Sequence, residues 1–405
     1  MKQATIIGTV LPEPNSTAAG TRMLQLVEFL KSENFKITFL STASVSEFSF
    51  DLSSIDVDFQ NILLNNASFE KLIKELNPDL VIFDRFTTEE QFGWKVSEIA
   101  PNALKILDTE DLHFLRKARE NAFKQSRNLQ ESDLISDVFK REIASILRCD
   151  LSLIISEFEM SLLTEKFKID TSILHYLPMF AEAKPCSVPF SERKNFISIG
   201  NFLHEPNWQT VLKLKNIWPK IRKRIPNAEL HIYGAYASKK VMQLHNEREK
   251  FLIKGRAESV EETFEKARVL LAPIPFGAGI KGKLLESMQF GLPNITTEIG
   301  AEGMKGNLDW NGFIAENDDD FIEKSVLLYQ DEKIWEESQK NGFKIVENLF
   351  SSDNFLSLFK QKMNELAVNL EQHRNENFLG QILQHHTLQS TKYLGKWIEE
   401  KNKRF

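Results

Sequence analysis

VLLAPIPFGAGIKGKLLESMQFGLPNITTEIGAEG, residues 269–303, is the stretch of sequence that decides the fold class. Its apolar start, residues 269–273, predicts a buried strand, and the glycine-rich segment after it predicts a turn. A helix is expected over residues 283–290, because its apolar residues recur at helical spacing and a glycine and a proline follow. Residues 294–297 predict the next strand. Strand, turn, helix and strand form one βαβ unit, which is typical of α/β folds with a parallel sheet.

The turn in this unit carries groups that bind phosphate. A helix N-terminus leaves backbone N–H groups free, and the helix dipole there favours an anion. Lys281 and Lys283 add positive charge at the same end, and the glycines allow close approach to the backbone. Glu286 lies one turn further, where its carboxylate could accept hydrogen bonds from ribose hydroxyls. We therefore predict a phosphate or diphosphate site; the alternative is that the glycines only permit tight packing and the lysines are solvated.

A rival hypothesis uses the same glycines. Gly277-x-Gly279-x-x-Gly282 matches the dinucleotide-binding fingerprint, and Glu298 and Glu302 lie near the distance expected for its ribose-binding acid. That fingerprint usually belongs to the first βαβ unit of a domain, whereas this match comes late in the chain. An NAD-dependent oxidoreductase is the function that this alternative predicts.

Composition narrows the function classes. The chain has 405 residues, 42% hydrophobic and 27% charged, which suits a globular protein of about two or three domains. The net charge of −6 provides no basic field, so no nucleic-acid partner is expected. Two cysteines, Cys149 and Cys186, cannot form a disulfide framework, and we expect Cys149 to be a core thiol and Cys186 to lie in a linker. No segment has the apolar length of a membrane span, and a cytoplasmic location fits.

Two halves of the chain repeat the α/β pattern. Strands are expected in the first half at residues 4–11, 35–40, 80–83, 105–107, 151–156 and 172–177. In the second half they are expected at residues 195–199, 229–233, 251–255, 269–273, 294–297 and 312–314. The proline-containing segment 178–194 predicts a linker. We therefore expect two Rossmann-like domains facing a cleft, 1–180 and 195–370, joined by residues 181–194 and followed by a helical extension, 371–405.

Two further segments of the first half could meet a ligand, and one at the end of the chain could meet a surface. The loop from Ser16 to Gly20 precedes a helix, and His113 follows an acidic segment at the end of a strand. Either could be structural: a plain loop, and a histidine packed at a helix start. Residues 387–405 predict a helix with Tyr393 and Trp397 near one face, which packs across the domains or, alternatively, lies on a membrane.

The sequence resembles the family 4 glycosyltransferases, also called glycosyl transferases group 1, which have the two-Rossmann GT-B fold. The second half carries the resemblance most strongly, in FGAGIKGKLLE at residues 276–286, GLP at 291–293 and GAEG at 300–303. Gly200-Asn201-Phe202 with His204-Glu205-Pro206-Asn207, and then Gly234, belong to it as well. In the first half, DTEDLH at residues 108–113 with Arg116 is similar.

The resemblance implies that a sugar moves from a nucleotide-diphosphate sugar to a glycan or lipid-linked acceptor with retained anomeric configuration, without an obligatory metal or other cofactor. It implies polysaccharide synthesis for the cell surface, in the cytoplasm or at the inner face of the membrane. Glu286 matches the last Glu of the family's E-x7-E motif, which holds the donor ribose, and His113 matches an acceptor-domain histidine close to the reacting sugar. The implied donor site comprises Gly20, Gly200, Asn201, Gly234, Gly279, Ile280, Lys281, Gly282, Lys283 and Glu286, with His113, Glu286 and Lys281 as catalytic candidates.

Two positions depart from the family pattern. The first Glu of E-x7-E is Ala278 here, so the carboxylate that would hold the hydroxyls of the donor sugar is missing. The loop from Asn201 to Asn207 lacks the Arg and Lys that many members have, and Lys281 or Lys283 could substitute. A catalytically silent binding protein that keeps the GT-B fold is therefore a third hypothesis.

Overall fold

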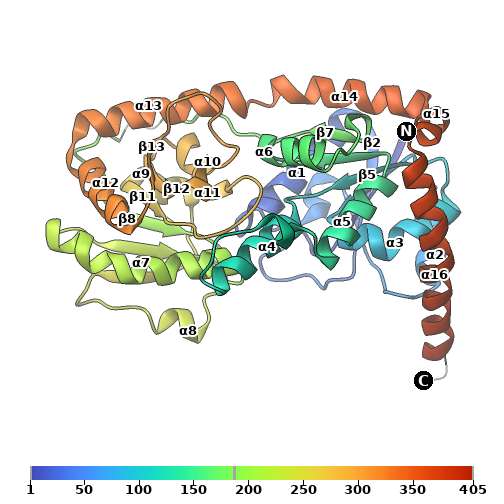
Figure 1. Ribbon diagram of the computed structural model, residues 1–405, viewed down its shortest axis with the longest axis horizontal. Coiled ribbons are helices and arrows are strands. Elements are labelled where there is room, and N and C mark those ends of the chain that lie inside the picture. The colour runs from blue at the N-terminus through green and yellow to red at the C-terminus, as the bar shows by residue number, and fades with distance from the viewer. Residues whose placement is uncertain (1, 186–187, 404–405) are drawn as a thin grey trace.

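A computed structural model describes residues 2–185 and 188–403 of the chain. Figure 1 shows two lobes, each built on its own sheet, with a layer of helices that runs along one side of both. Cys186, expected in the linker, lies outside the described residues. Cys149 is buried in the first core, as predicted.

The first lobe is a seven-stranded parallel sheet in the order β3-β2-β1-β4-β5-β6-β7. Its strands are β1 (Lys2–Gly8), β2 (Phe35–Ser41), β3 (Asp58–Asn61), β4 (Leu80–Asp84), β5 (Leu104–Asp108), β6 (Leu151–Ile154) and β7 (Leu174–Tyr176). Its helices are α1 (Ala18–Ser32), α2 (Ser68–Leu76), α3 (Phe86–Ile99), α4 (His113–Lys124), α5 (Asp137–Arg148) and α6 (Glu157–Ser161). Strand β3 was not predicted, because this edge strand is mostly exposed and has no apolar pattern.

The second lobe is a six-stranded parallel sheet in the order β10-β9-β8-β11-β12-β13. Its strands are β8 (Lys194–Ile199), β9 (Leu230–Tyr233), β10 (Phe251–Gly255), β11 (Ala267–Ala272), β12 (Asn294–Thr297) and β13 (Gly312–Ala315). Its helices are α7 (Glu205–Arg224), α8 (Lys239–Met242), α9 (Val260–Lys266), α10 (Gly282–Gln289), α11 (Glu298–Ala301), α12 (Asp318–Gln330) and α13 (Glu332–Leu349). In both sheets the order reverses beside the first strand, as in a Rossmann fold, which confirms the predicted fold class.

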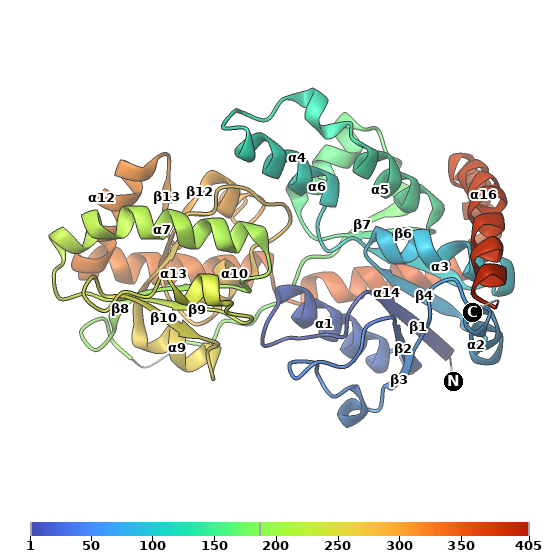
Figure 2. The same ribbon diagram turned by 90° about the horizontal axis from the view of Figure 1, so that it is seen from below.

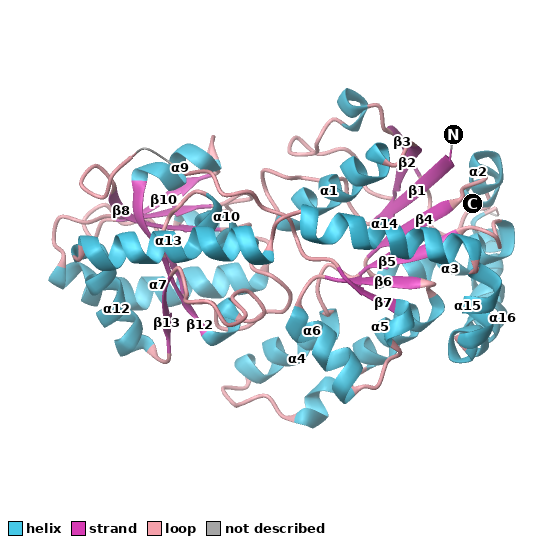
Figure 3. Cartoon of the chain, turned by 90° about the horizontal axis from the view of Figure 1, so that it is seen from above, coloured by secondary structure: helices cyan, strands magenta, loops and turns pink. Residues whose placement is uncertain are grey.

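Helices cover both faces of each sheet, as Figure 3 shows, and the central strands are correspondingly apolar. Strand β4 is buried along its whole length, and so is the segment Leu270–Ile274 that leads from β11 toward α10. The unit quoted first therefore forms as predicted: strand β11, a glycine-rich loop, helix α10 and strand β12. None of the described helices is long and apolar enough to cross a bilayer.

The end of the chain returns to the first domain through α14 (Asp353–Val368), α15 (Leu370–Glu376) and α16 (Phe378–Asn402). Phe359, Met363 and Leu366 of α14 join the first domain's core, and the Phe359 ring lies 4.9 Å from that of Phe29. Residues 353–370 thus pack on the first domain, whereas the sequence-based division placed them in the second. The reason is an apolar stripe on α14 that the first sheet buries.

Helix α16 confirms the predicted helical character of the C-terminal segment but not its placement across both domains. Its contacts are to the first domain: Glu399 pairs with Lys95 at 2.8 Å and Lys392 pairs with Glu98 at 2.8 Å. Figure 2 shows α16 at the far end of the first lobe, away from the second. The helices that connect the two lobes are instead α13 and α14 (Figure 1).

Candidate functional site

A cavity of about 480 Å³ lies between the two domains. Its walls come from loops at the carboxyl ends of strands in both sheets, where open α/β sheets bind ligands. The first domain contributes the β1–α1 loop with Thr17, and Arg85, Glu110, Asp111 and Arg116. The second domain contributes residues after β8, β9, β10 and β11, among them Gly200, Asn201, His204, Asn207, Gly234, Arg256, Ile280, Lys281, Gly282, Lys283 and Glu286.

The N-terminus of α10 lies at this cavity, and its N-cap residue, Lys281, caps no backbone N–H group with its side chain. Gly282 makes the position possible: a Cβ there would lie 2.5 Å from Cβ of Ala18 at the start of α1. The two helix N-termini therefore face each other across the seam, which concentrates positive potential in one place.

Two lysines flank this helix start, and both donate to neutral oxygens. Lys281 Nζ donates to the Gly279 carbonyl oxygen at 2.7 Å, and Lys283 Nζ donates to Oδ1 of Asn207 at 2.7 Å. Removal from solvent lowers the pKa of each lysine to about 8, with nearby carboxylates acting against the shift. A positive charge held this way is stabilised strongly by any anion that enters the cavity.

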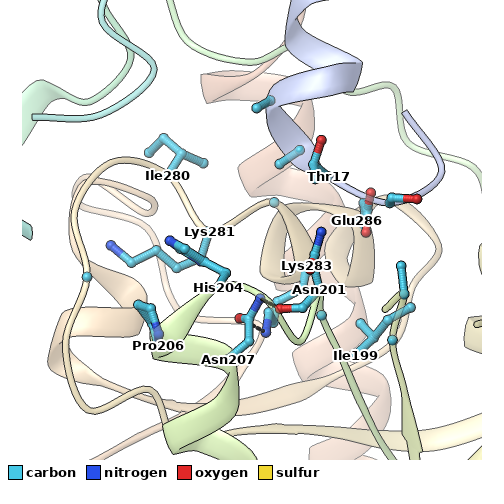
Figure 4. Close-up of a pocket in the computed structure, with 18 of the residues that line it drawn as sticks. Thr17, Ile199, Asn201, His204, Pro206, Asn207, Ile280, Lys281, Lys283 and Glu286 are labelled. Atoms are coloured by element: carbon cyan, nitrogen blue, oxygen red, sulfur yellow. Dashed lines mark hydrogen bonds between the residues drawn. The ribbon is translucent and has the colours of Figure 1, made fainter. Parts of the chain in front are cut away.

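Glu286 lies next to Lys283 on the first turns of α10. Figure 4 shows the two side chains below Thr17 of the first domain, with Asn201 and Asn207 beside Lys283. Burial raises the pKa of Glu286 to about 7, although the charge of Lys283 opposes the shift. The site therefore places one carboxylate in the second domain's half of the cavity, where it can accept hydrogen bonds from hydroxyl groups.

The glycines after β8 and β9 leave room for this arrangement. A Cβ at Gly200 would lie 2.7 Å from Lys283 Nζ, and a Cβ at Gly234 would lie 2.2 Å from the Gly200 carbonyl oxygen. Asn201 accepts through its carbonyl a hydrogen bond from Nδ2 of Asn207 at 2.9 Å, which orients that amide toward Lys283. Any side chain at either glycine would displace the lysine or the loop.

The first domain presents cations that are already paired. Arg85 lies 3.0 Å from a carboxylate oxygen of Asp84, and Arg116 Nε lies 2.8 Å from Oδ2 of Asp111. Burial raises the pKa of Glu110 to about 8, with Arg85 acting against the shift, so this acid is largely neutral at pH 7.

Three contacts close the seam between the domains. Arg119 of α4 makes a two-pronged ion pair with Glu302, both bonds 2.7 Å, and donates to the Gly277 carbonyl at 2.8 Å. Glu159 is fully buried and accepts from the backbone N–H of Gly279 at 2.8 Å. On the far side of the cavity, the Tyr236 hydroxyl lies 2.9 Å from both carboxylate oxygens of Glu13.

Comparison with known proteins now identifies the second domain. Residues 193–331 match the family model described as glycosyl transferases group 1. The second domain is a group 1 glycosyltransferase domain. No curated protein matches the sequence.

Solved structures with the same two-domain GT-B architecture extend the likeness to the whole chain. Sucrose-phosphate synthase from Thermosynechococcus elongatus superposes with a TM-score of 0.67 at 13% identity, over 90% of this chain and 99% of that one. A mutant of S. aureus TarM in complex with fondaparinux, alpha-GlcNAc-glycerol and UDP gives 0.66 at 10% identity, over 91% and 100%. The pneumococcal O-GlcNAc transferase GtfA, in complex with UDP and GlcNAc, gives 0.67 at 14% identity, over 90% and 99%. At these identities the likeness is one of fold.

The glycines of the group 1 glycosyltransferase domain do not form a dinucleotide fingerprint. In that fingerprint the glycines make the tight turn directly between a strand and its helix. Here residues 273–281 separate β11 from α10, Gly277 bonds to Arg119 of the other domain, and Gly279 bonds to Glu159. The G-x-G-x-x-G spacing of these glycines therefore does not correspond to the turn of a dinucleotide-binding fingerprint.

Most of the predicted site residues of both domains line the cavity, but Gly20, His113 and Gly279 do not. Gly279 has a φ of 61° and packs against the first domain, and Gly20 lets the β1–α1 loop fold back, since a Cβ there would lie 2.5 Å from the Glu13 backbone. His113 is not among the cavity-lining residues; its Nδ1 lies 3.2 Å from the Asp111 carbonyl oxygen and 3.3 Å from a Glu142 carboxylate oxygen. Its catalytic role stays a prediction.

Sequence reasoning missed Arg85, Arg119 and Arg256. Arg85 and Arg256 directly follow strands β4 and β10, and a charged residue at the carboxyl end of a parallel strand is a signal that could have found both. Arg119 has no such signal, because its partner Glu302 is 183 positions away in the other domain.

Proposed function

We propose that the protein is a retaining hexosyltransferase that moves a sugar from a nucleotide-diphosphate sugar to a glycan or lipid-linked acceptor. The observation that carries this proposal is the start of α10, where free backbone N–H groups and two lysines with lowered pKa values face one cavity. Cations and aligned dipoles at this point stabilise the negative charge that develops on a leaving diphosphate.

In this proposal the second domain holds the nucleotide part of the donor. The diphosphate lies at Lys281, Gly282 and Lys283, and the Glu286 carboxylate accepts from the ribose hydroxyls. The cations of the chain supply the charge stabilisation, so that no metal is required. The acceptor enters from the first domain, where His113 lies close to the reacting sugar. The contacts of Arg119 and Glu159 across the seam hold the two domains together around the cavity.

A uracil nucleotide is the first donor to test. TarM and GtfA were both solved in complex with UDP, and they share the two-domain fold with this chain. The base would lie beyond Glu286, near Tyr233, Gly234 and the end of β10. We propose that the product is a glycan for the cell surface.

Ala278 supports a second candidate, a GT-B protein that binds a nucleotide sugar without turning it over. This residue lines the cavity at the position of the first Glu of E-x7-E and brings no carboxylate there. Binding without turnover in the presence of any acceptor would favour this candidate.

Contact with the inner face of the membrane is part of the proposal, through α16. Among the side chains of this helix that the structure describes, six apolar ones are exposed: Phe378, Leu379, Ile382, Tyr393, Leu394 and Trp397. Lys401 lies over the Trp397 ring at 5.4 Å, and aromatic residues beside lysines are typical of helices that lie at a membrane interface. Sedimentation with anionic vesicles should therefore decrease in a Tyr393→Ser, Trp397→Ser variant; equal sedimentation would remove α16 from this role.

The central test is a thermal-shift screen with UDP, GDP, ADP, their sugar conjugates and NADH. A ligand at about 100 times its Kd stabilises the folded protein by about 2.7 kcal/mol, which raises the midpoint clearly. A shift with one nucleoside diphosphate that is lost in Glu286→Ala is the expected result. A shift with NADH alone would refute the proposal. Once an acceptor is found, the anomeric proton coupling of the product reports whether configuration is retained.

A further inference from the structure

We propose that Asp111 of the first domain supplies the carboxylate that holds the hydroxyls of the donor sugar, in place of the one that Ala278 lacks. This inference rests on the proposed function and deepens it. It assigns recognition of the sugar to a residue of the first domain, whereas the diphosphate site belongs to the second.

The backbone fixes Asp111 at the seam. The chain leaves β5 at Asp108, and Glu110 has a φ of 63°, a left-handed conformation that is uncommon outside glycine. The Asp111 N–H then donates to the Thr109 carbonyl at 2.7 Å, which closes a tight turn. This turn places Asp111 among the residues that line the cavity.

Asp111 lies against the loop that carries Ala278. A Cβ added at Gly279 would lie 2.8 Å from Cβ of Asp111, closer than such atoms approach in proteins. Gly279 is the next residue after Ala278, and both Ala278 and Asp111 line the same cavity. The first domain therefore brings a carboxylate to the place in the fold where the second domain's own loop has only a methyl group.

The carboxylate of Asp111 is ionised and has room for further hydrogen bonds. Burial alone would raise the pKa of Asp111, but the charges of Arg116, His113 and His204 outweigh it and hold the pKa at about 2. Arg116 Nε lies 2.8 Å from Oδ2, Arg116 Nη2 donates to Oδ1 at 3.3 Å, and His113 Nδ1 lies 3.3 Å from Oδ1. An ionised carboxylate accepts about four hydrogen bonds, so capacity remains for sugar hydroxyls on a side chain that is 16% exposed.

Other acids near this point are less suited. Both carboxylate oxygens of Glu302 already accept hydrogen bonds from Arg119. Glu159 is fully buried and does not line the cavity. Burial raises the pKa of Glu110 to about 8, against the opposing charge of Arg85, so that it is largely protonated near neutral pH.

The test compares two affinities in one variant, Asp111→Asn. Titration calorimetry measures binding of UDP and of UDP-glucose, UDP-galactose, UDP-N-acetylglucosamine and GDP-mannose, with GDP as the reference for the last. We expect the variant to lose about tenfold or more in affinity for the preferred sugar nucleotide, as for a hydrogen bond to a charged group, and less than about twofold for the free nucleotide. Asp137→Asn, an exposed acid of the same domain paired with Lys140, is the matched control and should change neither affinity.

A second variant separates sugar binding from a structural role. Adding Ala278→Glu to Asp111→Asn returns a carboxylate from the second domain and should restore at least part of the lost sugar-dependent affinity. Equal losses for nucleotide and sugar nucleotide, or no loss for either, would overturn the assignment of Asp111. So would a wild-type protein that binds no sugar nucleotide more tightly than the free nucleotide. If the protein binds no nucleotide at all, the proposed function fails together with this inference.

Discussion

The two domains hold their positive charges near the cavity in opposite ways. In the first domain each arginine faces a carboxylate: Arg22 with Asp108, Arg85 with Asp84 and Arg116 with Asp111, at 2.8, 3.0 and 2.8 Å. In the second domain Lys281 and Lys283 donate to a backbone carbonyl and a side-chain amide, both neutral. The buried arginines of the first domain are thus balanced by carboxylates inside the protein, whereas the two lysines donate only to neutral groups.

This difference indicates which charges stabilise the fold and which are available to bind a ligand. A buried arginine that is paired in the free protein is rigid and adds little new attraction for an anion. A lysine whose pKa is lowered to about 8 by burial gains its missing stabilisation when a diphosphate arrives. We therefore expect arginine variants to affect stability and lysine variants to affect affinity.

The largest effect is expected from Arg22→Met. Arg22 and Asp108 are almost fully buried, with 2% and 0% of their side chains exposed, and the variant leaves the Asp108 charge without its partner. Breaking such a pair costs about 3–5 kcal/mol of unfolding free energy. Urea denaturation followed by far-UV circular dichroism measures it, and nucleotide affinity of the folded variant should be unchanged, since Arg22 does not line the cavity.

Arg127→Met is the matched control for Arg22→Met. Arg127 pairs with Asp133 on the same domain, but its side chain is 32% exposed. An exposed pair of this kind contributes about 0–1 kcal/mol. Equal losses of stability in the two variants would contradict the view that the arginines next to the cavity serve the fold.

A smaller effect, on affinity alone, is expected from replacing Lys281 and Lys283 together by methionine. Each contact of a lysine with a phosphate is worth about 1.5–3 kcal/mol, so the double variant should bind nucleoside diphosphate at least about a hundredfold more weakly. Because a buried lysine with a lowered pKa is itself unfavourable, the melting temperature of the free protein should hold or rise. Calorimetric titration and differential scanning calorimetry check the two statements.

Lys220→Met and Lys223→Met, on the exposed side of α7, are the control for loss of two charges. If they weaken nucleotide binding as much as the cavity lysines do, general electrostatic attraction explains the affinity. The contrast between the domains would then have no bearing on the ligand.

The sequence predicted the second domain's half of the site well, because one contiguous segment builds it. Strand β11, the glycine loop and α10 follow each other in the chain, and turn residues, helical spacing and lysines are all visible there. Each of these signals is local, so the geometry follows from residues that are neighbours in the sequence.

The first domain's half could not be predicted in the same way. Asp111, Arg119 and Glu159 reach the glycine loop only because two separately folded sheets pack in one orientation, and nothing local in the sequence encodes that packing. The same reason explains why α14 was assigned to the wrong domain: its apolar stripe shows that it is buried but not against which sheet.

A third prediction concerns the pH dependence of sugar-nucleotide affinity. The pKa values of Lys281 and Lys283 are lowered to about 8 by burial, so their attraction for a diphosphate is present below pH 8 and is lost as the pH rises through it. Burial raises the pKa of Glu286 to about 7, so its ionised form is lost as the pH falls through 7. Affinity should therefore peak between about pH 7 and 8 and fall on both sides.

Two variants show which residues cause the decrease in affinity at low pH and at high pH. Glu286→Gln should remove the decrease at low pH, and the double lysine variant should remove the decrease at high pH. A profile that is flat from pH 6 to 9 in the wild-type protein would contradict the statement that the second domain leaves its charges open for the ligand.

The smallest effect is expected at Arg119, which links the first domain with its paired arginines to the second domain with its lysines. Arg119 belongs to the first domain, but its partners Glu302 and the Gly277 carbonyl belong to the second, so this arginine connects the paired side to the open side. Arg119→Met should let the two domains of the free protein move apart, which X-ray scattering would detect as a larger radius of gyration. Sugar-nucleotide binding should weaken by about tenfold or less, because the ligand must now also close the domains. Exchanging the charges, Arg119→Glu with Glu302→Arg, should recover closure but not the bond to Gly277. If Arg119→Met leaves both scattering and affinity unchanged, other contacts across the seam, among them those of Glu159 and Tyr236, hold the domains together without Arg119.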